Sequence, residues 1–146
     1  MAGKNKEAFT ANFKVDDAAT RKVIADRYFA IAGTLRGDDA KSIISSRAEC
    51  TGYLAIGAAW TGPADGTTFF CPIMKKNPEK LSKCVRMSWP GVIMHELSHN
   101  ARLFKPGALD TAQGPAECKR LSTAQAIKNA DTFNMFGQSM ALNTVC

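Results

Sequence analysis

Apolar residues recur at helical spacing in an early segment of the chain, between Asp16 and Arg36. The positions that set this pattern are Val23, Ile24, Tyr28, Ile31 and Leu35. Acidic residues stand at the start of the segment and Gly37 follows its end, as is typical of helix termini. After a polar start, the chain is therefore predicted to form an amphipathic helix here.

Short β-prone runs follow from Ser42 to Phe70. Their apolar members are Ile43, Ile44, Tyr53, Leu54, Ile56, Trp60, Phe69 and Phe70. Glycine and proline residues separate the runs, which is the usual punctuation of short strands joined by turns. This stretch predicts a small antiparallel sheet.

Two further helices are expected in the second half of the chain. Ser88 and Trp89 suit a helix cap and Pro90 a first turn, and this helix should end before Pro106. A third helix is predicted from residues 121–123 to about residue 141. No internal repeat or linker marks a boundary, so residues 1–146 are expected to form one domain.

The composition is that of an ordinary globular protein, with 45% hydrophobic and 22% charged residues among 146. The net charge of +6 raises the alternative of a nucleic-acid-binding module, but the lysines and arginines are scattered and form no long basic stripe. No apolar stretch reaches the ~20 residues that cross a bilayer. We therefore expect neither a nucleic-acid nor a membrane partner, and we expect a monomer.

The strongest chemical signal is an H-E-x-x-H motif inside the second predicted helix, formed by His95, Glu96 and His99. Residues four apart on a helix differ by only ~40° around its axis, so both imidazoles leave the same face one turn apart. That arrangement suits a single Zn²⁺, and Glu96 then stands beside the metal as a general base. These are the only two histidines in the chain.

With no third histidine, the remaining protein ligand must be a carboxylate or come from another chain. Downstream candidates are Asp110, Glu117 and Asp131. The residues from Gly107 onward can span ~10 to 13 Å when extended, which brings Asp110 within reach of the metal. Glu117 is also reachable, so distance gives only a modest preference for Asp110. Asp131 falls in the middle of the third predicted helix, where it suits a structural role or one that supports a ligand.

Five cysteines are spaced too widely for a C-x-x-C zinc or redox motif. They stand at positions 50, 71, 84, 118 and 146. Structural disulfides explain this spacing better than the alternative, five buried free thiols in an intracellular protein. The odd count leaves one thiol over.

Several segments resemble the aspzincins, the deuterolysin-like fungal metalloendopeptidases. The H-E-x-x-H helix is similar, and residues 107–114 stand in the frame of that family's G-T-x-D-x-x-Y-G segment. Phe69-Phe70-Cys71-Pro72 and the late helix with Lys128-Asn129-Ala130-Asp131 are similar too. The resemblance covers roughly residues 45–146.

This resemblance implies an α+β, zincin-like metalloprotease domain, with a small twisted sheet packed against helices. It further implies one catalytic zinc held by His95, His99 and Asp110, with Glu96 as the base. The expected protein is a secreted endopeptidase acting on proteins or peptides. By cysteine order, the resemblance pairs Cys50 with Cys71 and Cys84 with Cys146, leaving Cys118 free.

Two positions depart from the family frame. Ala108 stands in place of a threonine, and Gln113 in place of a tyrosine whose phenol, by the resemblance, stabilises the oxyanion. A glutamine amide still donates a hydrogen bond, whereas loss of such a donor can slow catalysis by ~10² to 10³. The only other phenols are Tyr28 and Tyr53, both far from the motif in sequence. The alternative function is thus a secreted effector or interaction protein on the same fold with weak or lost catalysis.

Overall fold

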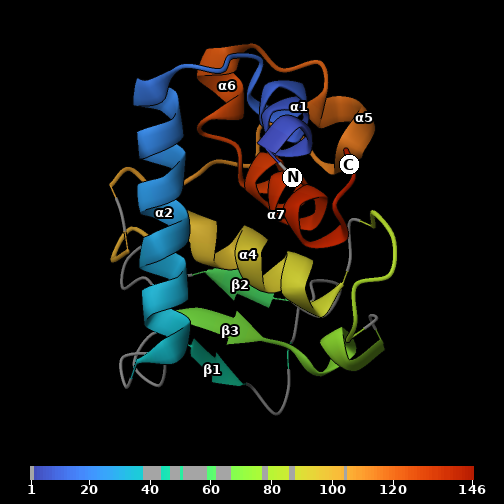
Figure 1. Ribbon diagram of the computed structural model, residues 1–146. Helices are drawn as coiled ribbons and strands as arrows, with labels where there is room; N and C mark the ends of the chain where they lie inside the picture. Colours follow the sequence, from blue (N-terminus) through green and yellow to red (C-terminus); the bar gives the residue numbers. More distant parts are fainter. Residues whose placement is uncertain are drawn as a thin grey trace.

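Two packed helices, α4 (Trp89–His99) and α7 (Ala130–Leu142), form the centre of the fold. Figure 1 shows α4 lying between a small sheet on one side and α7 on the other. The long helix α2 (Ala18–Arg36) runs along one end of these layers, and α1 (Ala2–Phe13) covers the far face of α7. The sheet and the helices therefore stack on opposite faces of the motif-bearing helix.

The computed structural model describes residues 2–37, 44–46, 50, 59–61, 67–76, 79–85, 88–103 and 105–146. Its other elements are β1 (Ile44–Ser46), β2 (Ala59–Thr61), β3 (Thr68–Phe70), the 3-10 helix η2 (Pro72–Lys76), α5 (Gly114–Cys118) and α6 (Thr123–Ala126). Among the helices in these ranges, none is long and apolar enough to span a bilayer.

The sheet is mixed, so the prediction of an antiparallel sheet is wrong in one of its two pairings. The strand order is β1-β3-β2, and β3 pairs antiparallel with β2 but parallel with β1. A parallel pair needs a long connection, which here includes β2, and apolar alternation alone does not reveal strand direction. Four of the predicted strand positions lie outside the described residues: Ile43, Tyr53, Leu54 and Ile56.

Helix α2 confirms the helix predicted from residue 16 to residue 36. The Asp17 side chain caps its start by accepting a hydrogen bond from the Thr20 amide at 2.8 Å. Gly37 is its C-terminal cap. The capping residue explains why the helix begins at Ala18 rather than at Asp16.

Helix α1 was not predicted, because its residues looked like a polar start. The missed signal was Phe9 and Phe13 at i and i+4, which place two aromatic rings on one face. Both are buried, with ring centroids 4.9 Å apart, and both pack edge-on or tilted against aromatic rings of α7. The N-terminal segment is therefore part of the main core.

The third predicted helix is broken in two. Its start is confirmed by a capping box at Ser122, but α6 ends at Ala126 and α7 begins at Ala130. At the break, the carbonyl of Lys128 and the amide of Ala130 both bond to the backbone of Leu109 instead of continuing a helix. A long-range pairing thus replaces local helical hydrogen bonds. The short helix α5 was likewise not predicted.

The two disulfides follow the pairing implied by the family resemblance. Cys50 bonds Cys71, Cys84 bonds Cys146, and Cys118 is free and buried. The alternative of five free thiols is therefore wrong. The second bond anchors the C-terminus to the segment that leads into α4.

Candidate metal centre

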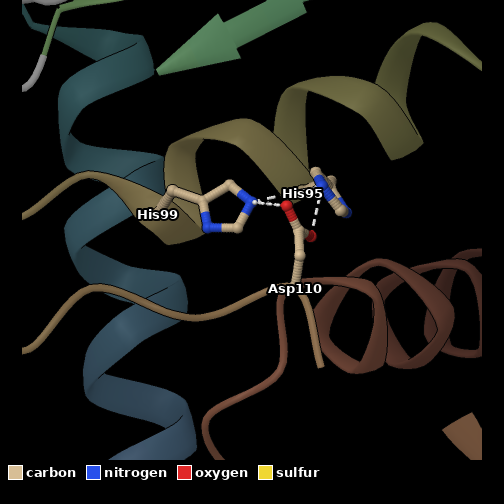
Figure 2. A group of neighbouring side chains, drawn as sticks. All are labelled: His95, His99 and Asp110. Atoms are coloured by element: carbon tan, nitrogen blue, oxygen red, sulfur yellow. Dashed lines mark hydrogen bonds and ion pairs between the residues drawn. The ribbon is translucent and has the colours of Figure 1, made fainter. Parts of the chain in front are cut away.

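Helix α4 presents both histidines on one face. Ser88 caps its start by accepting from the Gly91 amide, and Pro90 occupies its first turn, as predicted. The Nε2 atoms of His95 and His99 lie 3.2 Å apart, and Figure 2 shows the two rings on the same side of the helix. The helix ends at His99, well before Pro106.

Asp110 meets the two rings from the loop that follows α4. One carboxylate oxygen lies 3.2 Å from His95 Nε2 and the other 3.3 Å from His99 Nε2. Among the described residues, these three form the group of potential metal ligands, with one ligand atom from each within 4.8 Å of the others. Glu117, the other carboxylate in reach by sequence, is exposed and bonds Arg120 at 2.9 Å. The structure thus brings Asp110 rather than Glu117 to the histidines.

This donor set fits a zinc ion. Two donors on a tetrahedral Zn²⁺ at about 2.0 to 2.2 Å lie roughly 3.3 to 3.6 Å apart, close to the separations seen here. The side chains of His95 and His99 are 14% and 18% exposed, whereas that of Asp110 is 48% exposed. The centre therefore opens to solvent beside the carboxylate, as a catalytic site with a free coordination position requires.

The path of the chain to Asp110 depends on close backbone contact at Gly107. A Cβ on Gly107 would lie 2.1 Å from the His99 carbonyl oxygen. Just beyond it, the Ala108 amide donates to the Ser98 carbonyl at 2.8 Å, and the Leu109 amide donates to the Lys128 carbonyl at 2.7 Å. The loop is thus held against the end of α4 and against the break before α7.

Each histidine has a partner for its second ring nitrogen. His99 Nδ1 lies 2.8 Å from the Ala108 carbonyl oxygen, and His95 Nδ1 lies 2.8 Å from Asp131 Oδ1. Asp131 is buried in the first turn of α7, not in the middle of a helix as predicted. Sequence reasoning missed the helix break that puts it there, although Asn129 followed by Ala130 and an acidic residue is a helix-start pattern.

The charges of the site favour bound cations. Burial alone would lower the pKa of His95, but hydrogen bonds with Asp110 and Asp131 raise it to about 9. Burial opposes a similar rise for His99, whose pKa is raised by Asp110 and the Ala108 carbonyl. Hydrogen bonds from both imidazoles hold the pKa of Asp110 well below its usual range. The carboxylates thus remain charged, and a metal ion would replace the imidazole protons as the compensating positive charge.

The remaining residues singled out from the sequence lie as follows. Glu96 is partly buried beside His95, and its negative charge contributes to raising the pKa of that histidine. Gln113 is exposed at the start of α5. The Tyr28 hydroxyl donates to the Phe133 carbonyl, so this phenol belongs to the packing of α2 on α7. Tyr53 lies outside the described residues.

A helix that bears two histidines, a carboxylate from the following loop and an adjacent glutamate together form the ligand pattern of zincin-type metal sites. The aspzincin family model, described as lysine-specific metallo-endopeptidase, matches residues 1–138. The chain therefore belongs to the aspzincin family.

Similarity to individual proteins supports membership in this family. The chain is 30% identical over 142 residues to neutral protease 2 homolog MEP6 of Coccidioides posadasii, covering 97% of this chain and 40% of that protein. It is 35% identical over 133 residues to a neutral protease 2 homolog of Paracoccidioides brasiliensis, covering 88% and 36%. A zinc peptidase from Grifola frondosa shares the fold, with a TM-score of 0.70 at 21% identity over 93% of this chain and 78% of that one.

These findings confirm the predicted family and the zincin-like α+β fold. They also agree with the predicted cofactor, one zinc ion, for which the three clustered side chains are the candidate ligands. The chain spans about two fifths of the length of these curated relatives.

Proposed function

We propose that the protein is a zinc-dependent endopeptidase that hydrolyses peptide bonds in proteins or peptides. The observation that carries this proposal is the convergence of His95, His99 and Asp110, with both imidazole Nε2 atoms and the carboxylate within about 3.3 Å of each other. Membership in a metallo-endopeptidase family supports the same activity. Residues 1–146 would act as one domain and as a monomer.

The residues divide the chemistry between them. His95, His99 and Asp110 would hold zinc, which when bound polarises the substrate carbonyl and makes water a better nucleophile at neutral pH. Glu96 would accept the proton of the attacking water and pass it to the leaving amine. The exposed side of Asp110 leaves room for an extended peptide to approach. Gln113, three residues beyond Asp110, would offer an amide donor in place of a phenol.

The test of this function is cleavage of unfolded casein with and without a chelator. We expect zinc-dependent cleavage that the chelator abolishes. Glu96→Gln should retain zinc and lose turnover by a factor of at least 10², because the proton acceptor is removed while the ligands stay. Glu117→Gln, a matched change at an exposed carboxylate, should cleave like the wild type. Undiminished cleavage by Glu96→Gln would contradict the proposed base.

We also propose that the protein is secreted. Two disulfides support this, because such bonds persist in oxidising compartments and are rare in the cytosol. Fractionating a culture that expresses the full-length protein, and detecting it by antibody, tests the proposal. We expect it in the medium; retention inside the cells would contradict it.

One observation favours a second function, that of a secreted effector with the same fold and weak catalysis. Gln113 stands where the family resemblance places the tyrosine, and no phenol among the described residues reaches the site. The casein assay separates the two functions, since an effector would bind zinc but show little or no chelator-sensitive cleavage.

A further inference from the structure

The carboxylate of Asp131 joins parts of the site that come from different elements. Oδ1 lies 2.8 Å from His95 Nδ1 on α4 and accepts from Asn134 on α7 at 3.2 Å. Oδ2 accepts from the Gly114 amide, at the start of α5, at 2.5 Å. Only 1% of Asp131 is exposed. The carboxylate therefore contacts both His95, a candidate metal ligand, and the backbone of Gly114, in the segment that follows Asp110.

The bond to His95 fixes the form of that imidazole. A neutral imidazole carries its proton on one ring nitrogen, and the hydrogen bond made by one nitrogen decides which nitrogen is free to bind a metal. A carboxylate accepts and does not donate, so Asp131 requires the proton on Nδ1. The lone pair is then on Nε2, the atom that faces Asp110.

The bond to Gly114 fixes the other side of the site. Before Asp110, Leu109 is paired with the backbone of Lys128 and Ala130. After it, the Ala112 amide donates to Asn129 Oδ1 at 2.8 Å, and the Gly114 amide donates to Asp131. The segment that carries the carboxylate ligand is thus held on both sides of Asp110.

The position of Asp131 is itself supported by a row of amides along α7. Gln138 Nε2 donates to Asn134 Oδ1 at 2.6 Å and also to the Val85 carbonyl oxygen, and Gln138 Oε1 accepts a hydrogen bond from the Val85 amide. A Cβ at Gly91 would lie 2.6 Å from Asn134 Oδ1, so the glycine lets α4 approach this row. The carboxylate therefore has little freedom to turn away from His95.

From these contacts we propose that Asp131 is a positioning residue for the metal centre. It holds His95 in the tautomer that offers Nε2 and, through Gly114, keeps Asp110 opposite the two imidazoles. This inference rests on the proposed zinc site and adds to it a residue that does not touch the metal. It predicts that loss of the carboxylate weakens zinc binding even though all three ligands remain.

The experiment compares zinc affinity in Asp131→Ala and Asp131→Asn with the wild type, by competition against a chromophoric chelator. We expect a 10- to 100-fold loss for Asp131→Ala, the usual effect of removing such a partner. Asp131→Asn should lose less, because its amide oxygen can still accept from His95. Asp26→Asn, the same chemical change at an exposed residue on α2, should bind like the wild type.

A second measurement separates positioning from folding, because it follows the two histidine rings individually. In the zinc-loaded, nitrogen-15-labelled wild type, proton NMR should detect a hydrogen-bonded Nδ1 proton on His95 and another on His99. In Asp131→Ala the His95 proton should exchange rapidly, while that of His99, bonded to Ala108, should persist. A general loss of structure would affect both.

Wild-type affinity in Asp131→Ala, or a zinc-loaded His95 without a proton on Nδ1, would overturn the proposal. Casein cleavage by the same wild-type preparation keeps the two proposals apart. If the wild type binds zinc and cleaves casein while Asp131→Ala keeps its affinity, only the positioning role fails. If the wild type binds no zinc, the metal site itself fails, and the positioning role with it.

Discussion

His95 and His99 lie one turn apart on the same helix, yet different parts of the chain hold their rings in place. His99 bonds a main-chain carbonyl, that of Ala108, and His95 bonds a buried side-chain carboxylate, that of Asp131. The first contact depends on the path of the loop after α4. The second depends on where α7 begins. The geometry of the candidate metal centre thus depends on two separate structural conditions.

The difference also appears in the charge around each ring. His95 faces the carboxylates of both Asp110 and Asp131, whereas His99 faces that of Asp110 and a neutral carbonyl. Two anionic partners stabilise the protonated ring more than one does, which raises the pKa of His95 to about 9 against the opposing effect of burial. Side-chain carboxylates therefore hold the ring of His95 more than that of His99, whose position depends more on backbone geometry.

The largest effect should come from disturbing that backbone geometry with Gly107→Ala. The added methyl would lie 2.1 Å from the His99 carbonyl oxygen, so the loop must move away from α4. We expect destabilisation of about 3 to 5 kcal/mol and at least about a 100-fold loss of zinc affinity. Denaturant unfolding and chelator competition measure the two effects.

Gly33→Ala is the matched control for this change. Gly33 lies exposed in α2, and nothing is within 4 Å of the position that its Cβ would take. Alanine in a helix is favoured over glycine by up to ~1 kcal/mol, so this variant should be slightly more stable. Equal behaviour of the two variants would show that the loop tolerates a side chain at residue 107, and the dependence of His99 on chain path would be wrong.

These two conditions also explain what the sequence could and could not predict. The spacing of His95 and His99 needs only the geometry of one helix, so the motif and its helix were predictable from local residues. Chain length alone gave Asp110 only a modest preference over Glu117, because the approach of Asp110 depends on hydrogen bonds between Leu109 and residues 128 and 130. Those bonds are non-local, and the same pairing breaks the helix predicted to run through residue 129.

The sheet and helix α1 also depend on non-local contacts that local sequence patterns do not predict. The direction of β1 depends on a connection through β2, which apolar alternation does not encode. Helix α1 owes its place to Phe9 and Phe13 packing on α7, a tertiary contact that outweighs the polar character of the segment. Helix ends marked by Asp17, Ser88 and Ser122 were predictable because each cap is a local hydrogen bond.

A smaller effect, on the pH dependence of the metal-free protein, sharpens the contrast between the two rings. The pKa of His95 rises from 6.5 to about 9 on folding, so its contribution to stability is complete below pH 6.5 and is lost as pH rises through 9. The pKa of Asp110 is lowered on folding, so its contribution to stability is present at neutral pH and is lost as the pH falls below about 4. Stability should therefore be greatest between about pH 4 and 6.5.

Denaturant unfolding between pH 6.5 and 9 measures this loss, which we expect to be on the order of 2 to 3 kcal/mol. The zinc-saturated protein is the control, because imidazoles bound to metal no longer take up protons in this range. NMR titration of the metal-free protein should find His95 deprotonating at higher pH than His99. Metal-free stability that stays level or increases from pH 6.5 to 9 would contradict the assigned contacts.

The smallest effect concerns the rate of alkylation of Cys118, which packs against the segment that carries Asp110. Its sulfur is 3.5 Å from Asn129 Nδ2 and 3.8 Å from the Ala112 carbonyl oxygen, and burial raises its pKa to about 11. At pH 8 only about one thiol in 10³ is then ionised, and the thiolate is the reactive form. We expect iodoacetamide to label the native protein at least about 10-fold more slowly than the denatured, disulfide-intact protein, as followed by mass spectrometry.

Zinc should slow this labelling by a further few-fold. Alkylation requires residues 109–118 to separate from Asn129, and a ligand that ties Asp110 to α4 opposes that opening. Because the other four cysteines are in disulfides, the rate reports this segment alone. Equal rates with and without zinc would mean that Cys118 becomes accessible without movement of Asp110. The contact between His95 and Asp131 and the loop that carries Asp110 would then open independently. In that case residues 112–114 would not couple these two parts of the candidate metal centre.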